Sequence, residues 1–324
     1  PPHERIGEWL GDDLQADALA GFEAYLTRSP PDFTAEEIAE NWAEGSYWPI
    51  IWVLVAALME RLRHGKSFKD LPDDRLISAM LQIEHGLTRS EEARELGDAL
   101  EFELRERGAY ERYVRLLIEP YLRHRRTVVT GLYGLMRDSQ PDDFATRLAA
   151  EWLHSFPQMA ADAEEEMIDC LIRAHVKDTL RVLSVGRAWD EQGDDRSRRN
   201  WQAVALWTGF DAAEARMADE GSPDPSLLWT LRDRFSGGRH ADGTAVAIST
   251  RMTAWIIRTF RACWSWRDHP TGARSGDKNA WDASEYLTRL MGRLGDDLSG
   301  EALQLLAELR DAPPDGFTSY LRQV

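Results

Sequence analysis

Signals for the start of a helix recur along the sequence between residues 73 and 190 at nearly constant intervals. Capping residues, prolines and the onset of apolar stripes predict helix starts near residues 73, 91, 109, 127, 142, 161 and 178. Successive starts are 15 to 19 residues apart, and pairs of helices form units of 33 to 37 residues, which is the period of two-helix repeats. Because each predicted helix has one apolar face to bury, this spacing favours stacked helix pairs.

We therefore predict an all-α fold, an α-α superhelix of the degenerate HEAT/TPR-like helical-repeat solenoid type. The consensus residues of tetratricopeptide and ankyrin repeats are absent, so a simple bundle of long helices is the alternative. The composition agrees with a helical chain, because 38 Ala and 37 Leu stand against only 11 Val and 12 Ile. Strands need β-branched side chains to fill the pleat, so these counts exclude a sheet-dominated protein.

Short motifs predict where individual helices begin and end. Thr34–Glu37 and Thr88–Glu91 have the capping-box form, in which a hydroxyl and a glutamate satisfy first-turn amides reciprocally. Gly86, Gly108 and Gly221 follow periodic stretches, so we expect them to end helices.

The apolar stripes predict the core. The longest apolar run, residues 47–59, is shorter than the ~20 residues that span a bilayer, so we expect a buried helix there. Leu117 and Leu290 lie on stripes of helical spacing, and His175 continues a third stripe. All three side chains are therefore predicted to be buried.

The character of the chain changes near residue 190, where loops lengthen. Seven of the 13 tryptophans lie in residues 191–324. We predict a regular helical-repeat region over 1–190 and a Trp-rich helical region over 191–324, either as separate regions or as one continuous solenoid. The net charge of −17 divides into −14 and −3 between them. Such an acidic first region disfavours a broad surface for nucleic acid or for an anionic membrane.

The ends of the chain and its cysteines bear on where it works. The sequence opens on Pro1 without a methionine or a targeting segment and stops at Val324, so we expect a piece of a longer, cytoplasmic protein. Cys170 and Cys263 lie in no metal-like spacing. We expect both to be small buried side chains in a reducing compartment.

No pattern in the sequence predicts catalysis. Gly65-Lys66-Ser67 matches the end of a phosphate-binding loop, but Glu60 stands where that motif needs its first glycine. We interpret the tripeptide as a helix end followed by a solvated lysine. The eight histidines show no metal-ligand spacing and no nucleophile elbow occurs. We predict no catalytic residue, no cofactor and no metal site.

Two groups of side chains are candidates for binding a partner, and arginine and tryptophan are enriched in interface hot spots. The first is the basic cluster Arg123, Arg125 and Arg126. The alternative for this cluster is a set of cations near a helix C-terminus that pair with acidic helices. The second group lies along one predicted helix and the segment after it, namely Arg251, Arg258, Arg261 and Trp266. Ordinary packing with a solvated face is the alternative there.

The C-terminal stretch carries a family resemblance. Asn279-Ala280-Trp281-Asp282 leads into a helix, and Asp297-Leu298-Ser299-Gly300-Glu301-Ala302 forms the turn before another. This pattern resembles the end of the helical-repeat regions that follow the nucleotidase module in bacterial NACHT-type (STAND) NTPases. The resemblance covers about 45 residues and carries over no functional residue, because the nucleotide motifs of the family lie in a module absent from this sequence.

The resemblance implies a sensor region that recognises a trigger, such as a phage protein, and controls oligomerisation of the NTPase. We therefore expect a non-catalytic module that binds a protein or peptide ligand and contacts the rest of its own longer chain. Two alternatives stay open. One is an all-α enzyme with a buried polar site built from His154, His175 and the acidic helix 161–178. The other is a passive intramolecular scaffold.

Overall fold

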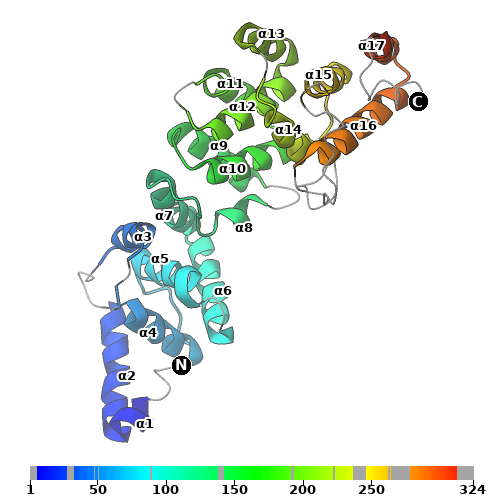
Figure 1. Cartoon of the computed structure of the whole chain (residues 1–324). Coiled ribbons are helices and arrows are strands. Elements are labelled where there is room, and N and C mark those ends of the chain that lie inside the picture. Colours follow the sequence, from blue (N-terminus) through cyan, green and yellow to red (C-terminus); the bar gives the residue numbers. More distant parts are fainter. Residues whose placement is uncertain are drawn as a thin grey trace. The chain divides into compact units, whose positions relative to one another are not determined.

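The computed structural model describes residues 6–27, 33–46, 48–49, 51–87, 90–137, 142–190, 193–221, 223–235, 246–261, 263 and 278–311. Every regular element within these ranges is a helix, so the prediction of an all-α fold is confirmed (Figure 1). The superhelical path of a solenoid stays a prediction. Contacts divide the chain into two compact units, residues 1–135 with 155–163 (unit 1) and residues 136–154 with 164–324 (unit 2).

Unit 1 contains the first seven α-helices and one π-helical turn. They are α1 (Ile6–Leu10), α2 (Asp12–Thr27), α3 (Ala35–Glu44), α4 (Ile51–Arg63), α5 (Asp73–Gln82), η2 (Ile83–Leu87), α6 (Glu91–Glu106) and α7 (Tyr110–Arg123). Helix α5 is central, since α3, α4, α6 and α7 all pack against it. The short helix α8 (Leu132–Met136) follows, at the division between the units.

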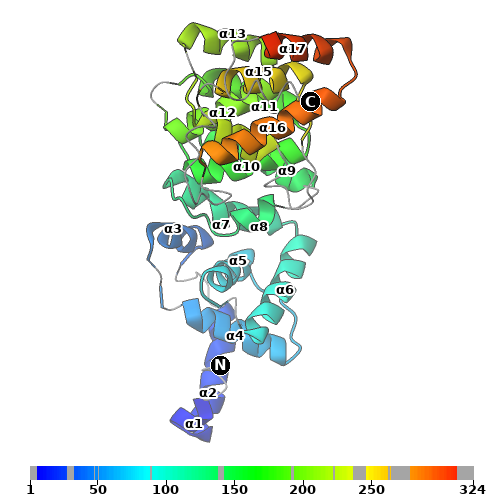
Figure 2. The same ribbon diagram turned by 45° about the vertical axis from the view of Figure 1, so that its right-hand side comes forward.

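Unit 2 contains the remaining helices. They are α9 (Asp143–Ser155), α10 (Ala161–Arg173), α11 (Lys177–Arg187), α12 (Asp195–Thr208), α13 (Phe210–Glu220), α14 (Leu227–Phe235), α15 (Thr250–Phe260), α16 (Ala280–Asp296) and α17 (Gly300–Asp311). The last residue of α9 and the first three residues of α10 belong to unit 1. Helix α12 packs against α11, α13 and α14, and α15, α16 and α17 pack against one another (Figure 2). The change of composition at residue 190 lies between α11 and α12, which are in contact within this unit.

Most predicted helix starts agree with the structure to within one residue. Helices α5, α6, α7, α9, α10 and α11 begin at residues 73, 91, 110, 143, 161 and 177. The start predicted at residue 127 is wrong, because α8 begins only at Leu132. Arg125 and Gly131 have φ angles of +53° and +78°. A right-handed helix cannot include left-handed residues, so the chain turns through this segment before α8 forms.

The helix-end motifs are partly confirmed. Thr34 and Glu37 form the predicted capping box at the start of α3. At α6 the cap is Ser90, whose hydroxyl accepts the backbone N–H of Ala93 at 3.1 Å, and the predicted Thr88 lies outside the described residues. The predicted stop at Gly86 is also wrong, because this glycine lies inside the turn η2.

The core contains the predicted apolar stripes, with Leu117 and Leu290 both buried. Four of the tryptophans after residue 190 are buried as well, namely Trp201, Trp207, Trp229 and Trp255. These four tryptophans therefore help to fill the interior of unit 2, whereas Trp281 is 39% exposed. Within the described part of the chain, no helix combines the length and apolar character that crossing a bilayer requires.

Two predictions of burial are wrong. His175 is exposed and has a φ of +57°, because α10 ends at Arg173 and the chain turns away before the histidine reaches the stripe. Cys263 is exposed just after α15, whereas Cys170 is buried as expected. Both sulfurs belong to free thiols. Periodicity places a residue on a face only while the helix continues, so it fails at helix ends.

Helix α5 carries a polar stripe into the core of unit 1. Arg75, Ser78 and Gln82 follow one another at helical spacing and are 2%, 1% and 0% exposed. The Arg75 guanidinium lies over the rings of Tyr25 and Phe33, at 4.9 and 5.6 Å from their centroids. Within the described residues, the Ser78 hydroxyl and both polar atoms of the Gln82 amide have no hydrogen-bond partner.

We expect Gln82→Met to stabilise unit 1. Burying an amide without hydrogen bonds costs about 1–3 kcal/mol, and methionine has a similar length without that cost. Hydrogen exchange of the α5 amides should therefore become slower. The matched variant Gln82→Glu should accelerate this exchange, because it buries a carboxyl group at the same position. Faster exchange in Gln82→Met than in the wild type would contradict this explanation of the stripe.

Candidate functional site

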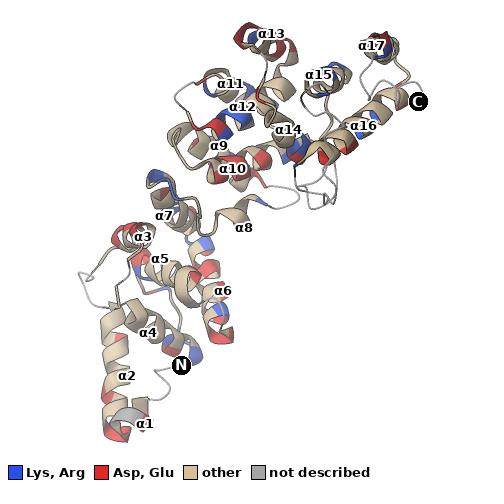
Figure 3. Cartoon of the chain, in the orientation of Figure 1, with Lys and Arg blue, Asp and Glu red and all other residues tan. Residues whose placement is uncertain are grey.

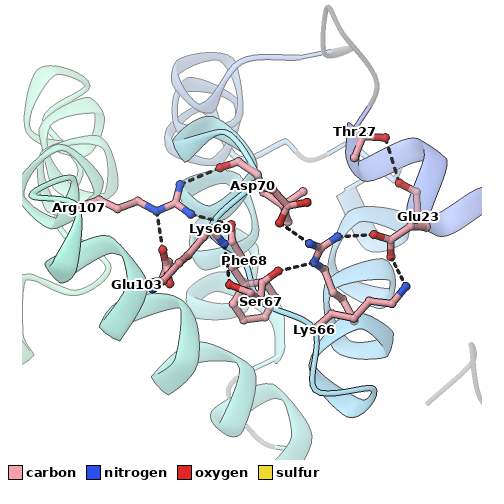
Figure 4. Close-up of polar contacts among 11 residues, drawn as sticks. Glu23, Thr27, Lys66, Ser67, Phe68, Lys69, Asp70, Glu103 and Arg107 are labelled. Atoms are coloured by element: carbon pink, nitrogen blue, oxygen red, sulfur yellow. Dashed lines mark hydrogen bonds and ion pairs between the residues drawn. The ribbon is translucent and has the colours of Figure 1, made fainter.

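The loop after α4 contains Gly65-Lys66-Ser67 and is held by two arginines (Figure 4). Arg61, which is 6% exposed, donates from Nε to the backbone oxygen of Ser67 at 2.8 Å and pairs with Glu23 and Asp70. Lys66 also pairs with Glu23, at 3.2 Å. The lysine ammonium is therefore directed at a carboxylate of the same unit. The tripeptide lies in the loop that follows the end of α4, as the sequence interpretation expects.

Arg107 holds the other side of this loop (Figure 4). Its two Nη groups donate to the backbone oxygens of Phe68 at 2.6 Å and Leu71 at 2.7 Å. Its Nε donates to Glu103 at 2.8 Å, and Nη1 also reaches Asp73 at 2.9 Å. Desolvation acts to lower the pKa of Arg107, but the carboxylates of Glu103 and Asp73 together raise it above its ordinary value. The contacts of Arg61 and Arg107 therefore account for the conformation of this loop without a ligand.

The acidic helix α10 contributes a buried ionic network to unit 2. Glu164 is 2% exposed, lies 3.2 Å from Arg187 and accepts hydrogen bonds from Ser197 and, at 2.6 Å, from Trp201. Desolvation lowers the pKa of Arg187, with Glu164 acting in the opposite direction. Every hydrogen-bond partner of this carboxylate is thus supplied by α11 or α12.

Two further carboxylates of α10, Glu165 and Asp169, belong to the same network. Glu165 lies 2.6 Å from Arg196 and 3.8 Å from Arg234. Asp169 lies 2.7 Å from Arg234, whose side chain is 2% exposed. The enzyme alternative requires these carboxylates to converge with histidines, but they converge with arginines.

The histidines of that alternative lie elsewhere. His154 and His175 are both exposed. Among the described residues, no group of three or more His, Cys, Asp or Glu side chains could hold a metal ion. The convergence of imidazole and carboxylate groups proposed for an α-helical enzyme is therefore not formed by these residues.

The predicted arginines of α15 are paired within unit 2. Arg251 lies 2.6 Å from Asp211 and 3.8 Å from Glu214 on α13. Arg258 lies 3.9 Å from Glu214 and 4.0 Å from Glu308 on α17. These pairs connect α15 to α13 and α17, which agrees with the packing alternative for this face.

The two remaining members of that group have different outcomes. Arg261 is half-buried at the end of α15. Trp266 lies outside the described residues. The role of the whole group in binding a partner stays a prediction.

The basic cluster at the end of α7 has mixed pairing. Arg123 pairs with Glu40 of α3, and His124 lies 3.1 Å from the same carboxylate, so the blue end of α7 lies close to red residues of α3 (Figure 3). Arg126 donates from Nε to the backbone oxygen of Ala43 at 2.8 Å, near the C-terminal end of α3, where cations are favoured. Arg125 donates to the side-chain oxygen of Gln158.

Two apolar side chains are exposed in the same segment. Val128 and Tyr133 are 79% and 58% exposed, whereas Val129 and Leu132 between them are buried. We call Arg125, Arg126, Val128 and Tyr133 together the α7–α8 surface. Sequence reasoning identified its arginines but missed Val128 and Tyr133. Residues 128–129 and 132–133 are two pairs of neighbouring apolar residues. Such pairs show no helical periodicity, so the sequence does not indicate which residue of each pair faces the core.

An aromatic stack lies at the α7 end beside this surface. The His85 ring lies between Trp42, 4.6 Å away between centroids, and Tyr121, 5.8 Å away, with interplanar angles of 14° and 16°. His85 Nδ1 lies 2.6 Å from the backbone oxygen of Leu81, which can only accept, so Nδ1 carries the proton. Nε2 of the neutral ring therefore accepts from the Tyr121 hydroxyl at 2.7 Å. This stack joins α3, η2 and α7.

We expect unit 1 to lose stability as the pH falls below the ordinary histidine value of 6.5. Burial lowers the pKa of His85, so the folded state binds the proton less tightly than the unfolded chain. The contribution of this neutral ring to the free energy of unfolding is complete above 6.5 and decreases as the pH falls from there. Hydrogen exchange of the α5 and α7 amides at several pH values measures this loss, once each observed rate is corrected for the intrinsic exchange rate at that pH.

The variant His85→Phe serves as the control for that measurement. Phenylalanine keeps the ring between Trp42 and Tyr121 but does not titrate. The pH dependence of exchange in α5 and α7 should therefore be weaker in the variant than in the wild type. An identical pH dependence in both would assign the effect to another group.

Comparison with protein-family models finds no match for this chain. Comparisons with curated proteins and with solved structures find no significant match either.

Proposed function

We propose that this chain is a non-catalytic binding module that recognises a protein or peptide through the α7–α8 surface. The observation that carries the proposal is the exposure of Val128 and Tyr133 beside Arg125 and Arg126. Tyrosine and arginine are enriched among the side chains that dominate binding energy in interfaces, and charged groups around an apolar anchor supply specificity.

Local order in this segment supports the proposal. Val129 and Leu132 anchor it in the core, and the backbone N–H of Leu132 donates to the oxygen of Val129 at 3.3 Å. A segment that is already ordered loses less conformational entropy when a partner binds.

The wider role that we propose is ligand recognition in a STAND NTPase of bacterial antiphage defence, in the cytoplasm. Support comes from the resemblance of residues 279–309 to the sensor regions of NACHT-type proteins. In this role the rest of the longer chain is a second partner, and ATP hydrolysis belongs to a module outside this sequence. Asn279 begins α16 with a capping box, and Ser299 caps the next helix through Ala302 at 3.1 Å. Asn279 and Ser299 of the motif therefore act as helix caps.

Site-specific photocrosslinking in bacterial cells challenged with phage tests the proposed function. A photoreactive amino acid at Val128 should give a discrete covalent adduct with one protein. The matched control places the same amino acid at Phe102 on α6, which is 65% exposed in the same unit. The proposal is wrong if position 128 gives no adduct, or if positions 102 and 128 give the same adducts.

A further inference from the structure

Arg125 and Arg126 differ from most arginines of unit 1 in their partners. Arg61, Arg107, Arg112, Arg115 and Arg123 each pair with at least one carboxylate. Within the described residues, Arg125 and Arg126 form no ion pair, since their side chains donate to the Gln158 amide oxygen and the Ala43 backbone oxygen. Their positive charges are therefore held by neutral acceptors and are not compensated locally.

The remaining donors of these two side chains suit a carboxylate. Hydrogen bonds to Gln158 and Ala43 use Nη2 of Arg125 and Nε of Arg126. Both Nη groups of Arg126, and Nε and Nη1 of Arg125, make no other hydrogen bond with the described residues, and both arginines are exposed. A guanidinium binds a carboxylate through two parallel N–H donors, which the two Nη groups of Arg126 supply, whereas Nε and Nη1 of Arg125 point apart and can each donate a single hydrogen bond to a carboxylate oxygen.

The backbone holds the two arginines in fixed positions. The N–H groups of Arg125 and Arg126 donate to the oxygens of Leu122 and Tyr121, at 3.1 and 3.0 Å. Arg125 has a φ of +53°, an uncommon conformation for a residue with a side chain. Such strained residues cluster at functional sites, where the surrounding structure maintains them.

The charge of unit 1 as a whole selects among anionic partners. Residues 1–135 and 155–163 contain 16 basic and 26 acidic residues. A nucleic acid or an anionic membrane presents negative charge over a wide area, so the acidic surroundings repel it. A short acidic peptide can place its carboxylates on the two arginines alone.

On these grounds, and resting on the proposed function, we infer that the α7–α8 surface binds an acidic peptide segment that carries an apolar anchor. Two carboxylates of the segment pair with Arg125 and Arg126. An aliphatic or aromatic side chain next to them packs against Val128 and Tyr133. Charge complementarity in this arrangement determines which segments bind, and the apolar contact adds affinity that does not depend on salt.

Selection from a displayed library of random twelve-residue peptides tests this inference. Peptides that bind the wild-type chain should be enriched in pairs of Asp or Glu beside an aliphatic or aromatic residue. Arg125→Glu and Arg126→Glu should each weaken the binding of a selected acidic peptide by ~30-fold or more, as for a hot-spot residue. Tyr133→Ala should weaken binding while leaving its salt dependence unchanged.

The matched control is Arg94→Glu, a charge reversal at another exposed arginine of unit 1, which should leave peptide affinity within about 3-fold. Two further experiments add a single-stranded oligonucleotide or inorganic phosphate as a competitor, and neither competitor should displace the peptide. Selected peptides without acidic residues, or displacement by the oligonucleotide, would overturn the acidic-peptide inference. If the selected peptides without acidic residues crosslink at position 128, the proposed function holds although the acidic-peptide inference is wrong. If no peptide is selected and position 128 gives no adduct, both the proposed function and the acidic-peptide inference are wrong.

Discussion

Replacing Arg234 by methionine is expected to lower the free energy of unfolding of unit 2 by about 3–5 kcal/mol. Arg234 is 2% exposed and donates from Nε to Asp169 at 2.7 Å, with Glu165 3.8 Å away. Removing the guanidinium leaves the Asp169 carboxylate buried without its cation. The cost comes mainly from this uncompensated charge, not from the loss of packing, because methionine occupies much of the volume of the arginine.

Denaturant unfolding followed by hydrogen exchange in α10 and α14 measures this effect. The control is Arg216→Met, which breaks the surface pair with Glu220, where the two side chains are 54% and 42% exposed. That change should cost only about 0–1 kcal/mol. The double variant Arg234→Met with Asp169→Leu should recover part of the loss, because it also removes the stranded carboxylate. A cost below about 1 kcal/mol for Arg234→Met alone would show that the network contributes little.

Leu290→Asp should destabilise unit 2 by about 4 kcal/mol or more, because it places a carboxylate in an apolar interior. Leu290 is 2% exposed on α16, a helix that packs against α15 and α17. A buried aspartate has no cation among the stripe residues Leu287, Met291 and Leu294 on its own helix. The side chain can enter the core only as the neutral acid, which adds the cost of protonation at neutral pH.

Thermal unfolding of the neighbouring variant Arg289→Asp provides the control, since residue 289 is exposed and the change should cost less than about 1 kcal/mol. Where Leu290→Asp does not fold, Leu290→Ala gives the graded measurement, with an expected loss of about 2–5 kcal/mol. A stable Leu290→Asp protein with unchanged unfolding would mean that this face of α16 is not part of the core.

Helix boundaries were the most predictable feature of this protein, because their signals are local. Thr34 and Glu37 can satisfy each other's amides with no help from the rest of the chain. Gly108 and Gly221 take positive φ angles at helix ends, which is also a local property because glycine has no Cβ. The starts of α5, α6 and α7, and those of α9, α10 and α11, are 16 to 19 residues apart, close to the predicted interval.

The failures of prediction share a different cause. His175 continues an apolar stripe in the sequence, yet the helix ends before it, and the side chain faces solvent. The π-helical turn at residues 83–87 changes the period locally, so the His85 ring between Trp42 and Tyr121 has no signature in a 3.6-residue pattern. Both failures occur where the regular α-helical period of the chain stops.

The all-α fold, most of the helix starts and the candidate binding positions can be predicted from the amino-acid sequence. Which arginines are available to a partner depends on contacts that form only in the folded chain. Arg251 and Arg258 are candidates in the sequence just as Arg125 and Arg126 are, but in the structure Asp211, Glu214 and Glu308 pair with the first two. Helix formation is driven by neighbours along the chain, whereas the compensation of a charge depends on which carboxylate the fold brings within about 4 Å.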